Sequence, residues 1–194
     1  MSTAAAAPRT GAVLADLLPA TRTRDIALVL GGAALTGVAA QLSVTVPGSP
    51  VPVTGQTFAA LLVGTALGAR RGFLSLAVYT LVGLAGVPWF SAGSSGPGGA
   101  SLGYVFGMLL AAAAVGALAE RGGDRSVLRT AATMVLGSAV IYAVGVPYLA
   151  VSTGMSTSAA ISAGLVPFLL GDGLKAALAT GAFPAAWTFV NRKG

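Results

Sequence analysis

Six stretches of mostly apolar residues divide the chain, and short polar or charged segments separate them. The stretches cover residues 26–43, 54–69, 72–88, 102–119, 127–149 and 163–190. A helix that crosses a bilayer needs about 20 residues, within a range of about 17–25. The pattern therefore predicts an all-α fold, an integral membrane protein with six transmembrane helices. The second and third stretches are short for this role. The sixth contains Pro167 and Pro184, each of which would kink the helix or mark one of its ends.

Charged residues occupy alternate connections between these stretches. The N-terminal segment, the second and fourth connections and the C-terminal end carry arginine or lysine, whereas the first, third and fifth connections carry no charge. With six spans, every basic residue except Lys175 falls on one side of the membrane. Because cytoplasmic loops carry the excess of Lys and Arg, we expect a multi-pass protein of the cytoplasmic (inner) membrane with both termini in the cytoplasm. Residues 1–24 would be a flexible cytoplasmic tail, residues 25–191 the transmembrane domain and residues 192–194 the cytoplasmic end.

The composition supports the same class of protein. Hydrophobic residues make up 55% of the chain and charged residues 8%, whereas soluble domains carry about 25% charged residues. The absence of cysteine and histidine from the sequence excludes disulfides, thiolate nucleophiles, histidine catalysis and the usual zinc sites, so we expect neither an enzyme nor a metal site. The net charge of +6 fits lipid headgroups better than nucleic acid, because the basic residues form no single patch. The sequence also lacks a P-loop motif for ATP.

Asp172 and Lys175 are two charged residues well inside an apolar stretch, whereas Arg129 lies at the start of the fifth stretch. Their spacing of three places them on one face of a helix, in its outer half if the termini are cytoplasmic. A charged residue at the membrane centre costs about 2.5–3.5 kcal/mol on insertion scales, so an intramembrane pair indicates a functional site. The alternative is a salt bridge that holds the sixth helix against its neighbours. A carboxylate beside an ammonium suits a neutral ligand with adjacent N–H and C=O groups, such as a urea or amide ring.

Aromatic residues are expected near the same outer side, where they would line an apolar pocket or form an interfacial belt. They are Trp89, Phe90, Tyr104, Tyr142 or Tyr148, and Phe168. The first outer connection contains three prolines and should be extended. The third is rich in Gly and Ser, which favours either a lid over a ligand or a plain linker.

Small residues spaced four apart recur on the predicted helices. Two such pairs, Ala27 with Gly31 and Ala33 with Gly37, lie on the first one. Small residues let helices approach closely in lipid. These pairs therefore serve either internal packing or the docking of another subunit.

Several motifs occur together in one order. They are VPVT-x-Q-T from Val51, G-x-x-x-G-x-R-x-G from Gly64, Y-x-x-x-G-x-x-G-x-P-x-F from Tyr79, and G-D-x-x-K from Gly171. Over residues 41–179 the chain resembles the BioY family, the biotin-specific substrate-binding (S) components of energy-coupling factor (ECF) transporters. The resemblance implies an S-component-like bundle of six helices, cytoplasmic termini and high-affinity biotin capture near the outer face. It also implies two kinds of partner, a transmembrane coupling protein and two cytoplasmic ATPases. Those partners would hydrolyse ATP, and this chain would bind no cofactor.

The resemblance assigns roles to individual residues. Asp172 and Lys175 would bind the ureido ring of biotin, and aromatic side chains would pack on its fused rings and valeryl chain. The further ligand contacts implied are Trp89, Phe90, Tyr104, Gln56, Thr54 and Tyr142. The coupling protein would dock on the first helix, with Ala33 and Gly37 as the best match and Ala27 and Gly31 next. Two alternatives remain: an S component for another vitamin, and a stand-alone transporter or channel for a small solute.

Overall fold

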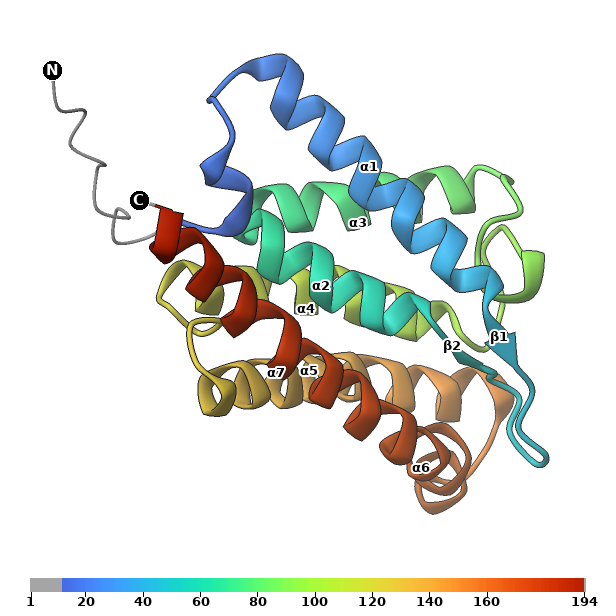
Figure 1. Cartoon of the computed structure of the whole chain (residues 1–194). Helices are drawn as coiled ribbons and strands as arrows, with labels where there is room; N and C mark the ends of the chain where they lie inside the picture. Colours follow the sequence, from blue (N-terminus) through green and yellow to red (C-terminus); the bar gives the residue numbers. More distant parts are fainter. Residues whose placement is uncertain (1–11, 194) are drawn as a thin grey trace, which may run out of the picture.

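Helices form most of the chain that the computed structural model describes, which is residues 12–193. Over this range the α-helices are α1 (Arg22–Gln41), α2 (Gln56–Leu67), α3 (Ala69–Leu84), α4 (Leu102–Glu120), α5 (Val127–Thr153), α6 (Thr157–Gly164) and α7 (Leu169–Lys193). Short 3-10 turns add η1 (Leu14–Leu17), η2 (Ser91–Gly93) and η3 (Val166–Phe168). Figure 1 shows the long helices side by side in one bundle. The predicted all-α fold is confirmed.

The central helix of the bundle is α4, which packs against α2, α3 and α5. An apolar 18-residue segment of α4 is 61% buried, whereas the corresponding 18-residue segment of α1 is 28% buried. Within the described residues, four helical segments are long and apolar enough to cross a membrane: α1, α4, α5 and the segment from Thr157 to Arg192. Helix α2, with 12 residues, is shorter than a usual span. The large apolar area on the outer helices fits a bilayer rather than water as the surrounding solvent.

The two short predicted stretches form two separate helices because the chain reverses between them. Gly68 joins α2 to α3 with a φ of 85°, a left-handed conformation that glycine adopts without steric cost. Glu120 then caps α3, since its Oε1 accepts a hydrogen bond from the Ala69 amide at 2.9 Å. The third stretch was expected to begin at residue 72, but α3 begins at Ala69 and includes Arg70 and Arg71.

The sixth apolar stretch is divided into two helices. Helix α6 ends at Gly164, Pro167 lies in the turn η3, and α7 runs from Leu169 to Lys193 with Pro184 in its interior. Of the two prolines, Pro167 therefore lies at a true helix boundary. This break places Asp172 in the first turn of α7, where the positive end of the helix dipole favours a carboxylate.

The loops at the two ends of the bundle differ in structure. The segment around η1 and the end of α7 lie at one end, and the β1–β2 hairpin and α6 lie at the other (Figure 1). Strands β1 (Ser43–Val44) and β2 (Val53–Thr54) pair antiparallel, so the proline-rich connection folds back as a hairpin loop with a turn at residues 46–49, rather than running extended throughout as predicted. The glycine-rich connection is held against α1, because the Gln41 side-chain amide donates a hydrogen bond to the Trp89 carbonyl at 3.1 Å.

Part of the predicted flexible tail packs on the bundle. Val13 and Ala15 are buried in a small cluster with Ala119, and Leu28 and Leu67 pack against them. Arg125 donates a hydrogen bond to the Ala12 carbonyl at 2.7 Å. The prediction of a flexible tail over residues 1–24 is therefore corrected where Val13 and Ala15 are buried and where residues 22–24 begin α1, whereas Leu17 and Leu18 are 49% and 51% exposed. Residues 1–11 of that tail lie outside the described residues.

A buried carboxylate ties α7 to the connection between α4 and α5. Asp124 is fully buried, and its Oδ2 accepts a hydrogen bond from the Trp187 indole N–H at 2.6 Å. The Arg125 guanidinium lies 3.5 Å from the Trp187 ring centre, and its Nε lies 3.4 Å from Asp124 Oδ1. Burial raises the pKa of Asp124, and the hydrogen bond from Trp187 and the charge of Arg125 offset this in part. Two segments of the chain, the connection between α4 and α5 and helix α7, thus meet at this carboxylate.

We expect Asp124→Ala to lower the stability of the purified protein, because it leaves the buried indole N–H without an acceptor. The expected cost is about 1–3 kcal/mol, measured as a fall in melting temperature in detergent. The matched control is Asp124→Asn, which keeps a carbonyl acceptor for Trp187 and should lose clearly less. Equal losses in the two variants would show that the indole hydrogen bond does not stabilise the fold.

Candidate functional site

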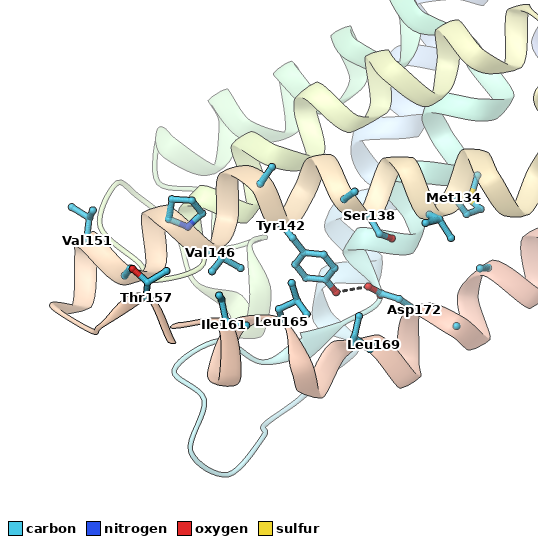
Figure 2. Close-up of a pocket in the computed structure, with 17 residues that line it drawn as sticks. Met134, Ser138, Tyr142, Val146, Val151, Thr157, Ile161, Leu165, Leu169 and Asp172 are labelled. Carbon is cyan, nitrogen blue, oxygen red and sulfur yellow. Dashed lines mark hydrogen bonds between the residues drawn. The ribbon is translucent and has the colours of Figure 1, made fainter. Parts of the chain in front are cut away.

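Four polar side chains from three helices meet between α2, α5 and α7. On α7, Lys175 Nζ lies 3.2 Å from Asp172 Oδ1. Nζ also donates a hydrogen bond to Thr57 Oγ1 of α2 at 2.7 Å. The Tyr142 hydroxyl of α5 donates to the other carboxylate oxygen, Asp172 Oδ2 (Figure 2). The side chains of Asp172 and Lys175 are 16% and 18% exposed to solvent. Each charge is therefore paired, as a group in an apolar environment must be.

A cavity of about 840 Å³ opens beside this cluster, between α5, α6 and α7. Figure 2 shows Tyr142 and Asp172 pointing toward each other across it. The polar groups on its surface include Asp172, Tyr142 and Ser138, and its remaining surface is mostly aliphatic, with Val146, Ile161, Leu165 and Leu169 among the lining residues. Small-molecule sites usually have volumes of about 300–1,000 Å³, apolar walls and a few placed polar groups. The cavity matches a ligand that has a polar head and an apolar remainder.

The polar groups of this cluster are hydrogen-bonded to one another. Tyr142 supplies a donor to the carboxylate, and Thr57 supplies an acceptor to the ammonium. These are the two functions that a ligand with adjacent N–H and C=O groups would supply. A ligand that binds this pair therefore replaces internal hydrogen bonds with its own, and the net gain is smaller than the new bonds alone would provide.

Tyr104 lies next to this cluster but its hydroxyl is already bonded. Its ring meets Tyr142 edge-on at 6.4 Å between centroids and stacks on Phe168 at 6.3 Å. The hydroxyl donates to the Gly164 carbonyl at 2.7 Å. A Cβ at Gly145 would overlap the Tyr104 ring, so this glycine allows the close approach of α4 and α5. Tyr104 thus supports Tyr142 from the side of α4.

Trp89, Phe90 and Gln56 belong to a different cluster, between α1, α2 and α3. The Trp89 indole N–H donates to the Tyr79 carbonyl at 2.9 Å, and the Phe90 ring meets the Tyr79 ring edge-on at 5.3 Å. The Tyr79 hydroxyl donates to Gln56 Oε1 at 2.7 Å. None of the three lines the cavity beside Asp172.

The predicted site residues thus fall into two groups. The structure brings Asp172, Lys175, Tyr142 and Tyr104 together. Trp89, Phe90 and Gln56 pack elsewhere, and Thr54 is buried in β2. Ligand contact stays a prediction for all eight residues.

Sequence reasoning missed Thr57 and Ser138. Thr57 follows Gln56 in the first turn of α2 and bonds Lys175 directly. Ser138 lies one turn before Tyr142 on α5 and lines the cavity. For Ser138 the sequence did hold a signal, because its hydroxyl lies in an apolar helix four residues before the candidate Tyr142. For Thr57 the sequence held no such signal, because its partner is 118 residues away.

The predicted docking residues of α1 separate onto two faces. Ala33 is 1% exposed, and the Trp89 ring covers Gly37 so closely that a Cβ there would overlap it. Both residues pack inside the bundle and are covered in this arrangement, and their docking role stays a prediction. Ala27 and Gly31 instead line an open groove of about 250 Å³ between α1 and α2. Their docking role stays a prediction.

Fold and site together define a multi-pass helical membrane protein with a cavity for a small molecule. The chain belongs to the BioY family, whose sequence model matches residues 9–192. The chain is 37% identical over 161 residues to the "Probable biotin transporter BioY" of Pyrococcus horikoshii, covering 81% of this chain and 93% of that protein. It is also 37% identical over 139 residues to the "Biotin transporter BioY" of Thermotoga maritima, covering 70% of this chain and 80% of that protein.

Further comparisons agree on the family and the fold. The "Biotin transporter BioY2" of Lactococcus lactis is 32% identical over 163 residues, which cover 82% of this chain and 88% of that protein. A crystal structure described as the S-component for biotin from an ECF-type ABC transporter superposes with a TM-score of 0.76. At 19% sequence identity it covers 88% of this chain and 95% of that chain, and it shows a shared fold. The predicted S-component-like bundle is therefore confirmed. The family is one of transporters, which confirms that the chain is not an enzyme.

Proposed function

We propose that this chain captures biotin with high affinity as the substrate-binding S component of an ECF-type importer. The observation that carries the proposal is the Asp172–Lys175 pair beside the 840 Å³ cavity, in a member of the BioY family. The names of the relatives as biotin transporters and the shared fold with a biotin S-component support the same ligand.

The chemistry of the pair suits the ureido ring of biotin. The ring offers two N–H donors and one carbonyl acceptor, and a carboxylate beside an ammonium offers the complementary groups. Asp172 would accept from the N–H groups and Lys175 would donate to the carbonyl. The fused rings and the valeryl chain would lie along the aliphatic surface formed by residues such as Ile161, Leu165 and Leu169. No cofactor is needed for this step.

Binding then requires an exchange of hydrogen bonds. The Tyr142 hydroxyl occupies Asp172 Oδ2, where a ureido N–H would bind, and Thr57 Oγ1 holds the ammonium that would meet the carbonyl. These internal bonds lower the cost of holding two charges in an apolar surrounding. The same bonds compete with the ligand.

We further propose that the chain lies in the cytoplasmic membrane with both termini inside. The start of α1, the start of α3, the connection between α4 and α5, and the end of α7 lie at one end of the bundle (Figure 1). Within residues 12–193, they carry the basic residues other than Lys175. This distribution fits the rule that cytoplasmic loops are rich in Lys and Arg. The α7 turn that carries Asp172 then lies toward the outer face, where biotin arrives. A transmembrane coupling protein and two cytoplasmic ATPases would supply the energy, and the coupling protein would approach α1 at Ala27 and Gly31, which line the open groove.

We expect Asp172→Asn and Lys175→Ala each to weaken biotin binding by about 1–3 kcal/mol, because each leaves a polar group of the buried ligand unpaired. Isothermal titration of the detergent-purified protein measures this loss. Arg192→Gln is the control, since this exposed residue lies at the far end of α7. Unchanged affinity in both site variants would refute the assigned site, and binding of another vitamin in place of biotin would identify a different substrate.

We expect Tyr142→Phe to bind biotin at least as tightly as the unchanged chain and to associate faster. The substitution keeps the aromatic ring but removes the hydroxyl that donates a hydrogen bond to Asp172 Oδ2. The association rate can be followed by stopped-flow fluorescence. Tyr104→Phe is the matched control, because its hydroxyl bonds Gly164 rather than the carboxylate. A marked loss of affinity in Tyr142→Phe would mean that the hydroxyl binds the ligand instead of competing with it.

We expect the chain to need its partners for transport. Proteoliposomes that contain the chain alone should bind biotin without ATP-dependent accumulation. Proteoliposomes that also contain the coupling protein and the ATPases should accumulate it when ATP is enclosed on the ATPase side. Accumulation by the chain alone would instead support the stand-alone transporter, while leaving the assignment of the biotin site intact.

A further inference from the structure

A second groove, of about 810 Å³, runs between α1 and α3 at the end of the bundle that carries the basic residues. One part of its surface is aliphatic, formed by residues such as Ile26, Val29, Leu30, Leu74 and Val78. The other part holds charged groups from α1, α3 and the segment before α1. This groove shares no lining residue with the cavity beside Asp172, so it lies outside the proposed biotin site.

The acidic groups in this groove are already occupied. Asp16 Oδ1 lies 2.8 Å from Arg71 Nη1, and Asp25 Oδ1 lies 3.0 Å from Arg71 Nε. Asp25 also pairs with Arg24 at 2.6 Å. Glu120 accepts the hydrogen bond from the Ala69 amide. The carboxylates therefore neutralise Arg71 and Arg24 and cap a helix.

Two arginines in the groove remain without partners. Arg22 is the first residue of α1, Arg70 is the second residue of α3, and both are exposed. Across residues 12–193, neither side chain makes a hydrogen bond or an ion pair. Two free guanidinium groups that share one groove form a site for a phosphate group, because each can donate two parallel hydrogen bonds to its oxygens.

The aliphatic part of the groove faces outward. Ile26 is 61% exposed, Leu30 53% and Leu74 41%. These residues lie on two helices of the transmembrane bundle, so their exposed area faces lipid chains. They are also large and branched, unlike Ala27 and Gly31 on the α1–α2 side. Close helix packing in membranes favours small residues, so this side suits flexible acyl chains better than a partner helix.

We propose that the α1–α3 groove binds one anionic phospholipid. Its headgroup phosphate contacts Arg22 and Arg70, and its acyl chains lie along Ile26, Leu30 and Leu74. Basic pockets between transmembrane helices on the cytoplasmic side are suited to anionic headgroups. The bound lipid covers the side of α1 that is opposite to the groove of Ala27 and Gly31, and it links the ends of α1 and α3.

The test is a titration of phosphatidylglycerol onto the delipidated, detergent-purified full chain, followed by native mass spectrometry. Each basic group near a lipid surface contributes about 1 kcal/mol. The double variant Arg22→Gln with Arg70→Gln should therefore bind phosphatidylglycerol roughly 30-fold more weakly. The control is Arg121→Gln with Arg129→Gln, which removes two exposed arginines outside the groove and should retain the lipid. Phosphatidylcholine should bind weakly to the unchanged chain and to both double variants.

Several outcomes would overturn the lipid site. One is an equal weakening of phosphatidylglycerol binding in the two double variants, which would show that the lipid responds only to the overall surface charge. Another is displacement of the lipid by soluble glycerol phosphate, which would show that the aliphatic surface adds nothing. A third is a groove variant that keeps the lipid but no longer purifies with the transmembrane coupling protein, which would assign the groove to a protein partner. Biotin binding serves as the folding control, since neither arginine lines the cavity beside Asp172.

Discussion

The structure depends on how one carboxylate and one ammonium are accommodated among apolar helices. Two isolated charges would each cost about 2.5–3.5 kcal/mol in the membrane centre. Here Asp172 lies in the first turn of α7, pairs with Lys175 and accepts a hydrogen bond from Tyr142. The Thr57 hydroxyl oxygen accepts a hydrogen bond from the ammonium of Lys175. The pair therefore brings α2, α5 and α7 into one arrangement, and the cavity forms where α5 and α7 meet α6.

Helix α7 connects this site with the opposite end of the bundle. Its first turn carries Asp172, and Trp187 near its last turn bonds the buried Asp124 between α4 and α5. Arg125 stacks on Trp187 and reaches the Ala12 carbonyl. Helix α7 is thus held by polar contacts near both of its ends.

Helix α1 presents three different surfaces. Ala33 and Gly37 face inward, where Gly37 allows the Trp89 ring to pack directly on the backbone. Ala27 and Gly31 line the open groove with α2, and Ile26 and Leu30 line the groove with α3. Both pairs of small residues have the same spacing of four. One pair, Ala33 with Gly37, is buried inside the bundle, and the other, Ala27 with Gly31, lines an open groove. The two pairs differ in what packs against them, which is set by the neighbouring helices and by the loop after α3 that carries Trp89.

The sequence by itself determined the membrane class, the number of apolar stretches and the Asp172–Lys175 pair. These features rest on local composition and on the cost of charge in lipid, which are readable without coordinates. The break of the last stretch at Pro167 followed from proline chemistry, although the sequence did not distinguish it from Pro184. Tertiary structure decided which residues complete the pair: Thr57 lies 118 positions from Lys175, whereas Trp89 and Phe90 pack around Tyr79 instead. It also decided that Ala33 and Gly37 are covered. Those outcomes depend on contacts between distant segments, and a spacing along one helix specifies a face but not what lies against it.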